Sequence, residues 1–159
     1  MNISGEATIV GTSQSSVYTD TLLYDFIVPY PASKLIDGLG LDGNFYKENG
    51  CAHTVGSEGT YEWFSLELQV PQIITRVQIA DRVVGNGIFT RNLHITIGPS
   101  QAYDPNEPQC LPEIPELEHR PGLQDFFCSG ALHKGKFVKI ARPGGMNICE
   151  VKVFTLSGK

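Results

Sequence analysis

Residues 62–80 read EWFSLELQVPQIITRVQIA, and this stretch decides the predicted fold. Every second residue from Phe64 to Val70 is apolar, and the positions between them include serine, glutamate and glutamine. A period of two residues indicates a β-strand with one buried face. The second half also has the composition of a strand, and Pro71 between the halves predicts a turn. The stretch therefore predicts two successive strands.

The rest of the chain repeats this pattern in short strand-like runs separated by turn residues. No stretch carries the sustained apolar spacing of an amphipathic helix. About seven or eight short strands predict an all-β fold, an antiparallel β-sandwich or barrel, with functional loops at 19–62 and 99–124. Without a linker or an internal repeat, we expect a single domain over residues 1–159. The other runs are EATIVG (6–11), NLHITIG (92–98), DFFCSG (125–130), KFVKIAR (136–142) and NICEVKVFTL (147–156).

The bulk composition argues against several classes of function. The net charge is −5 and no basic run occurs, which argues against nucleic acid or an anionic membrane as a partner. The longest apolar runs are far too short to insert into a bilayer. Signature motifs of serine hydrolases, metalloproteases and P-loop proteins do not occur, so we do not expect an enzyme.

The chain has four cysteines, Cys51, Cys110, Cys128 and Cys149. None forms a C-x-x-C pair, which argues against a zinc ribbon or a thioredoxin-like site. An even count in an acidic chain rich in glycine and proline predicts two disulfides and an oxidising compartment. Three pairings are possible, and the spacing does not choose among them. The start MNISGEATIV has no signal-peptide pattern, which fits either a cytosolic protein or a mature secreted domain, and the cysteine count favours the secreted domain.

Two stretches stand out as candidate binding segments. Residues 34–54 read KLIDGLGLDGNFYKENGCAHT, whose two Asp-Gly turns can bring carbonyls and a carboxylate together as a calcium site requires. Ordinary turns are the alternative interpretation. Residues 79–98 read IADRVVGNGIFTRNLHITIG, in which a Gly-Asn-Gly turn lies between Arg82 and Arg91. This pattern predicts either a hairpin with two solubilising charges or one wall of a binding site.

Taken together, the motifs of residues 7–155 resemble the F-type lectins, or fucolectins. The resemblance implies a discoidin-like β-sandwich jelly roll, similar to galactose-binding domains, that binds terminal L-fucose, holds a structural calcium ion, is extracellular and has no catalytic activity. The motifs are, in order, GTSQSS, KLIDG, NFYKENGCAHT, WFSLEL, ITRVQIADR, LHITIG, FFC, GKFVKIARPGG and ICEVKVF.

The same resemblance implies a disulfide pairing and a set of calcium ligands. The pairs are Cys51–Cys149 and Cys110–Cys128. The family uses a serine just before the first loop cysteine, where this chain has Gly50, and Asn49 is a candidate replacement. The implied Ca²⁺ ligands are the side chains of Asp37 and Glu150 and the backbone carbonyls of Lys34, Leu39 and Cys149.

The resemblance also implies a sugar site. His53 matches the family's histidine two residues after the loop cysteine, and Arg82 matches the arginine of its Arg-x-Asp triplet. Both would donate hydrogen bonds to sugar hydroxyls. Phe45 and Tyr46 match the aromatic pair that lines the pocket for the fucose methyl group, although Phe45 fits a core position equally well.

This chain departs from the family pattern directly after Arg82. Val84 replaces the aspartate of the triplet, and Gly85-Asn86 replace a vicinal cysteine pair. The second basic position falls on Phe89, which with Ile88 is a candidate apolar platform in place of the disulfide. Arg91 lies two residues further on, on the same strand face by alternation, and is the candidate second sugar donor if a turn bulge brings it into the site.

Two hypotheses follow from this pattern. One is a fucose-binding lectin whose partners are fucosylated glycans, presented by a homo-oligomer or a tandem-repeat chain for avidity. The other is an adhesion module of the same fold that binds another glycan or a protein.

Overall fold

The computed structural model describes residues 4–20, 28–41, 50–56, 59–83, 91–112 and 116–156. They form antiparallel strands and a short 3-10 helix, η1 (Ala32–Ile36). Across these ranges, no helix has the length and apolar character that a membrane crossing needs. The strands are β1 (Ser4–Glu6), β2 (Ile9–Gln14), β3 (Thr19–Asp20), β4 (Val28–Pro29), β5 (Ala52–His53), β6 (Tyr61–Asp81), β7 (His94–Gly98), β8 (Leu123–Phe127), β9 (His133–Pro143) and β10 (Asn147–Leu156).

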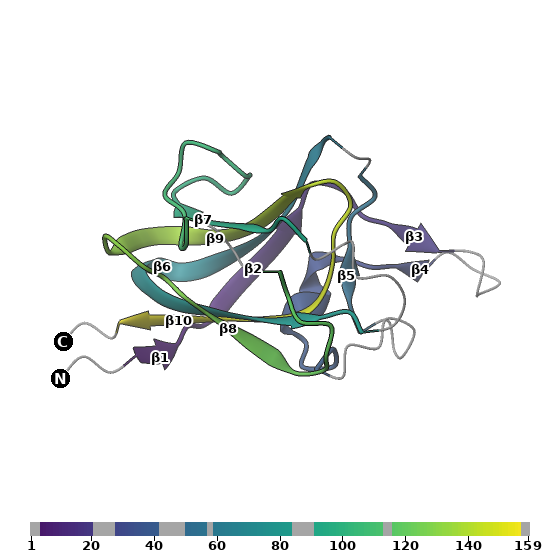
Figure 1. Cartoon of the computed structure of the whole chain (residues 1–159), viewed down its shortest axis with the longest axis horizontal. Helices are drawn as coiled ribbons and strands as arrows, with labels where there is room; N and C mark the ends of the chain where they lie inside the picture. The colour runs from purple at the N-terminus through teal and green to yellow at the C-terminus, as the bar shows by residue number, and fades with distance from the viewer. Residues whose placement is uncertain are drawn as a thin grey trace.

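Strand β6, 21 residues long, is the central strand of the sheet. Its first half pairs with β2 and β9, and its second half pairs with β10 and β8. The strands follow the order β1-β10-β6-β9-β7, with β2 and β8 paired to β6 and β5 paired to β10. In Figure 1, β7 and β9 lie in one layer, β10 and β8 lie in another, and β6 curves from the first to the second. The described residues confirm the predicted all-β antiparallel architecture.

The turn predicted at Pro71 is wrong, because β6 runs through this position without a break. The register between β6 and β9 shifts between Glu67 and Gln72, so the regular ladder is interrupted around the proline. Proline has no backbone N–H and is tolerated where a strand bulges rather than inside a regular ladder. Pro71 thus lies within the register shift, between the part of β6 that pairs with β2 and the part that pairs with β10.

Of the two alternatives for residues 79–98, the hairpin is wrong. Strand β7 pairs with β9 and not with β6, so the connection between β6 and β7 crosses from one layer to the other. Arg91 precedes β7, which begins at His94, so it does not lie on a strand face as alternation suggested. The Gly-Asn-Gly turn itself falls outside the described residues.

The core lies between the two layers and is built from alternate residues of the long strands. Phe64 and Leu66 in the first half of β6 are fully buried, as are Val77 and Ile79 in the second half. Burial of each such side chain contributes about 1.5–3 kcal/mol to stability. The facing members of this cluster are Ile95 and Ile97 of β7, Val138 and Ile140 of β9, and Ile148, Val151 and Val153 of β10.

The segment that follows β7 covers the outer face of its layer. Its position is fixed by the Cys110–Cys128 disulfide and by a buried ion pair between Lys139 of β9 and Glu107. The Lys139 ammonium also donates to the carbonyl of Ser100 at 2.7 Å. A buried charge is tolerated only when it is paired and hydrogen-bonded in this way. The described part of the predicted 99–124 loop is therefore anchored to the sheet by charge as well as by the disulfide.

Candidate functional site

One end of the fold brings together β5, the end of β6 and the start of β10. Cys51, just before β5, forms a disulfide with Cys149 of β10, and Cys110 pairs with Cys128. Both predicted pairings are therefore confirmed. The Cys51–Cys149 bond ties the segment before β5 to a central strand across a sequence separation of 98 residues. Two groups of candidate residues adjoin this bond.

The first group is a row of side chains across three strands. Ile148 of β10 pairs with Asp81 of β6 on one side and with Ala52 of β5 on the other. The next position of β10, Asn147, pairs with His53. Arg82 follows Asp81 directly after the end of β6, so a continuation of the antiparallel register would bring it opposite Asn147. Directly paired residues share a face of the sheet, so His53 and Asn147 lie side by side, and Arg82 adjoins this row at the end of β6.

His53 is held rigidly at the centre of this end of the fold. Its backbone N–H donates to the carbonyl of Tyr30 at 3.0 Å, and its carbonyl accepts from the N–H of Tyr18 at 2.9 Å. Its ring lies 4.5 Å from the ring of Tyr18, centroid to centroid. Burial and the positive charge of Arg82 lower the pKa of His53 to about 4. The imidazole is therefore neutral at pH 7, with one N–H donor and one acceptor nitrogen.

Arg82 follows Asp81, the last residue of β6, and is half-buried. The positive charge of its guanidinium contributes to the lowered pKa of His53, the other predicted sugar donor. The carboxylate of Asp81 is 1 % exposed and lies 3.1 Å from Nδ1 of His119. His119 was not among the predicted site residues, because it comes from the distant 99–124 segment.

Arg91 does not join this row in the described structure. Its Nε forms an exposed ion pair with Glu116 at 2.8 Å. Its carbonyl accepts a hydrogen bond from Arg142 at 2.9 Å. The second basic side chain predicted for the sugar site is thus already engaged by a carboxylate. Phe45, Tyr46 and Phe89 lie outside the described residues.

The second group surrounds the carboxylate of Glu150, which is 3 % exposed. Helix η1 ends at Ile36 with Asp37 as its C-cap, and Gly38 takes a left-handed conformation with φ of 76° that favours glycine. This turn aims the N–H of Gly38 at both carboxylate oxygens of Glu150, at 3.2 and 3.3 Å. The N–H of Leu39 donates to the carboxylate of Asp37 at 3.0 Å. The chain around η1 therefore wraps the start of β10 through backbone donors.

The carboxylates of Asp37 and Glu150 both lie at this end of the cavity. Burial and the negative charge of Asp37 raise the pKa of Glu150 to about 7, although hydrogen bonds from Gly38 and Gly40 and the charge of Lys152 favour its ionised form. The Lys34 ammonium lies 3.8 Å from Asp37, with both side chains partly exposed, so it offsets the charge of Asp37 only in part. A cation bound beside Glu150 would favour its ionised form further.

Carbonyl oxygens converge on the same place. Gly40 is buried, and a methyl group added to its Cα would overlap the carbonyl oxygens of both Cys149 and Gly50. The sequence did not single out Gly40, because the close approach joins three segments that are distant along the chain. Asn49, the candidate replacement ligand, lies outside the described residues.

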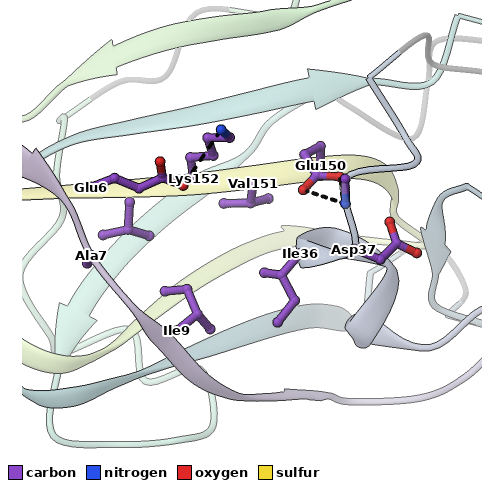
Figure 2. Close-up of a pocket in the computed structure, with 10 residues that line it drawn as sticks. Glu6, Ala7, Ile9, Ile36, Asp37, Glu150, Val151 and Lys152 are labelled. Atoms are coloured by element: carbon purple, nitrogen blue, oxygen red, sulfur yellow. Dashed lines mark hydrogen bonds and ion pairs between the residues drawn. The ribbon is translucent and has the colours of Figure 1, made fainter.

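A cavity of about 340 Å³ opens beside this group. Figure 2 shows Asp37 and Glu150 at one end of it and Glu6 and Lys152 at the other, with apolar side chains between. Across the described ranges, no three His, Cys, Asp or Glu side chains gather closely enough to hold a metal ion. Any cation bound here would therefore be held by the two carboxylates together with backbone carbonyls.

We expect Gly40→Ala to destabilise the protein by about 1–3 kcal/mol, because the added methyl must displace backbone rather than a flexible side chain. Denaturant unfolding of the variant measures this loss. Gly5→Ala is a matched control, since nothing lies within 4 Å of a methyl group at Gly5. Equal stability of the two variants would contradict the close approach at Gly40.

No protein-family model matches the chain, and no curated protein matches its sequence. Solved structures do match. An F-type lectin from the serum of the striped bass, Morone saxatilis, aligns with a TM-score of 0.75 at 23% identity over 95% of this chain. This chain spans about half the length of that lectin, 49%.

Two bacterial modules of similar size also match. A fucose-binding module of Streptococcus pneumoniae aligns with a TM-score of 0.65 at 24% identity, covering 95% of this chain and 96% of the module. A family 32 carbohydrate-binding module of C. perfringens NanJ, solved with galactose, aligns with a TM-score of 0.64 at 19% identity, covering 96% and 99%. These likenesses confirm that the chain shares the fold of the F-type lectins and discoidin-like modules, as its sequence predicted.

Proposed function

We propose that this chain is a carbohydrate-binding lectin that recognises terminal L-fucose on glycans or glycoproteins. The observation that carries the proposal is the placement of His53 beside Arg82 at one end of the fold. The F-type lectin and the fucose-binding and galactose-bound modules that share this fold support it. We include in the proposal that the protein is not catalytic and is secreted, as its two disulfides favour.

The chemistry of the two side chains suits a neutral sugar. A guanidinium presents several N–H donors in a fixed fork, and a neutral imidazole adds one donor and one acceptor. Sugar hydroxyl and ring oxygens accept such bonds, and charged donors make the stronger ones. Because backbone bonds to Tyr18 and Tyr30 fix the backbone of His53, little ordering entropy is lost there on binding.

We further propose that Ca²⁺ binds between η1 and the start of β10. The ligands would be the carboxylates of Asp37 and Glu150 with the carbonyls of Gly50 and Cys149, and carbonyls of Lys34 and Leu39 are further candidates. Hard oxygen donors of this kind are what Ca²⁺ prefers. A bound cation would also neutralise the negative charges of Asp37 and Glu150 and hold the segment after η1 against the start of β10.

A panel of immobilised glycans tests the fucose proposal. We expect the calcium-loaded protein to bind fucosylated glycans and to be displaced by free L-fucose, with D-mannose as the control competitor. Single sugar contacts are weak, so detection on the panel relies on avidity. Size-exclusion chromatography of the same sample reports whether the avidity comes from an oligomer. Folded protein that binds no glycan in a fucose-inhibitable way would overturn the proposal.

We expect a chelator to lower the melting temperature by about 5–10 °C and added Ca²⁺ to restore it, because the ion binds only the folded state. Glu150→Gln should abolish the response of the melting temperature to Ca²⁺, since it removes one of the two proposed carboxylate ligands and its negative charge. Differential scanning calorimetry measures both effects.

Glu6→Gln is the matched control for the calcium experiment. Glu6 lines the same cavity at the opposite end, where it lies 3.7 Å from the ammonium of Lys152 (Figure 2). The Glu6 variant should keep the full response to Ca²⁺. The calcium proposal would be overturned if chelator did not change the wild-type melting temperature. It would also be overturned if both variants lost the response of their melting temperature to Ca²⁺ equally.

The ion pair between Arg91 and Glu116 favours one alternative function. If that pair persists in solution, the site has one arginine donor fewer than the family pattern, and the same loops would suit another glycan or a protein. The glycan panel separates these alternatives, because binding without inhibition by L-fucose selects the second.

A further inference from the structure

Asn147 lies in the same row as the two proposed sugar donors. Its backbone pairs with His53 of β5, and on its other side β6 ends at Asp81, the partner of Ile148, with Arg82 following directly. The Asn147 side chain is 0% exposed. Neither its amide oxygen nor its amide nitrogen has a hydrogen-bond partner in the part of the chain that the structure describes. Asn147 is thus a buried amide whose NH₂ donor and carbonyl acceptor both lack a hydrogen-bond partner among the described residues.

Such a residue weakens the fold. Burying an amide removes its bonds to water, and the loss is recovered only when protein groups replace them. A shape-matched apolar side chain at the same place would avoid this cost. Buried polar groups without partners are rare in native proteins, and they gather at sites where function rather than stability selects the residue.

The chemistry of an amide complements its two neighbours. The guanidinium of Arg82 is only a donor, and the neutral imidazole of His53 offers one donor and one acceptor. The Asn147 carbonyl can accept an N–H from either side chain, and its NH₂ can donate to the imidazole.

We propose that Asn147 is the positioning residue of the glycan site, whose amide orients His53 and Arg82 when a sugar is bound. The proposal rests on the function proposed above. Because the amide is shielded from solvent, it acts through its two neighbours and does not touch the sugar. Both bonding functions of the amide are available for this role, because neither has a hydrogen-bond partner among the described residues.

The test uses Asn147→Leu, which keeps the approximate shape and removes both bonding functions. We expect this variant to melt at or above the wild-type temperature and to bind methyl α-L-fucoside at least tenfold more weakly by calorimetry. Thr96→Val is the matched control. Thr96 of β7 is also fully buried with an unpartnered hydroxyl, but it lies on another strand outside the row. This variant should also keep its stability, and its affinity should not change.

A second readout distinguishes positioning from a structural role. In the wild-type protein, the side-chain NH₂ signals of Asn147 should shift and become protected from exchange when methyl α-L-fucoside binds. An Asn147→Leu variant that retains its affinity, or that melts far below the wild type, would overturn the inference alone. Failure of the wild-type protein to bind any fucoside would overturn it together with the proposed function.

Discussion

Removing the Cys51–Cys149 disulfide should lower the free energy of unfolding by about 4–5 kcal/mol, the largest stability loss that we expect from any single change. The bond closes a loop with a sequence separation of 98 residues, and the chain entropy released in the unfolded state grows with loop length. The Cys51→Ala, Cys149→Ala double variant and denaturant unfolding measure it. Cys110→Ala, Cys128→Ala, with a separation of 18 residues, should lose about 3 kcal/mol.

The first disulfide also joins both proposed sites. Cys51 follows Gly50 and precedes β5, which carries His53, and Cys149 immediately precedes Glu150. Its removal should therefore abolish the calcium response and sugar binding even at temperatures where the variant remains folded. The Cys110–Cys128 variant should retain both activities under matched conditions. Equal loss of binding in the two variants would show that this end of the fold does not depend on the Cys51–Cys149 link.

Replacing His53 with alanine should weaken fucoside binding by about 100-fold, which corresponds to about 2.7 kcal/mol. The ring is 8% exposed and packs on Tyr18, so the variant should also lose about 1–2 kcal/mol of stability. His53→Gln keeps a polar side chain of similar length and separates packing from binding. Calorimetric titration at a temperature where all three proteins are folded makes the comparison. Unchanged affinity in His53→Ala would remove the histidine from the site.

The low pKa of His53 predicts how binding and stability depend on pH. Its pKa falls from an ordinary 6.5 to about 4 through burial and the charge of Arg82, so only the unfolded chain takes up this proton between those values. The stability associated with the neutral ring is full above pH 6.5 and declines as the pH falls toward 4. Fucoside affinity should stay constant from pH 8 to about 5.5 and be lost near the lowered pKa. The wild type should lose more stability than His53→Gln across this acid range.

Local patterns in the sequence predicted the strands well because burial imposes a period of two wherever one face meets the core. The alternation at Phe64 and Leu66 is an example, since both side chains are fully buried. Pairing partners are not local, however. The segment around Arg82 and Arg91 has the pattern of a hairpin, yet β7 pairs with β9 across the other layer. The alternation of apolar and polar residues in a segment indicates which of its faces is buried, but it does not indicate which strand pairs with it.

The residues of the candidate site were also predicted only in part, because local patterns do not identify neighbours that are distant along the chain. His53 and Arg82 were identified through the order of motifs, which carries information about spatial neighbours that spacing alone lacks. Asn147 was missed because it sits at the start of a strand-like run, where an asparagine resembles an ordinary turn residue. Only the register of β5, β10 and β6 places it beside His53 and next to the end of β6, where Arg82 follows. Gly40 was missed for a similar reason, since its neighbours Gly50 and Cys149 are distant along the chain.

The most direct test of the account is an NMR titration of the calcium-loaded protein with methyl α-L-fucoside, observed at the imidazole signals of His53. The ring is neutral and shielded at pH 7, so its signals report local contacts rather than a change in protonation. We predict a saturable shift at His53 that free L-fucose reproduces and D-mannose does not. A titration that leaves the His53 signals unchanged, while the protein is folded and loaded with calcium, would contradict the assignment of this end of the fold as a fucose site.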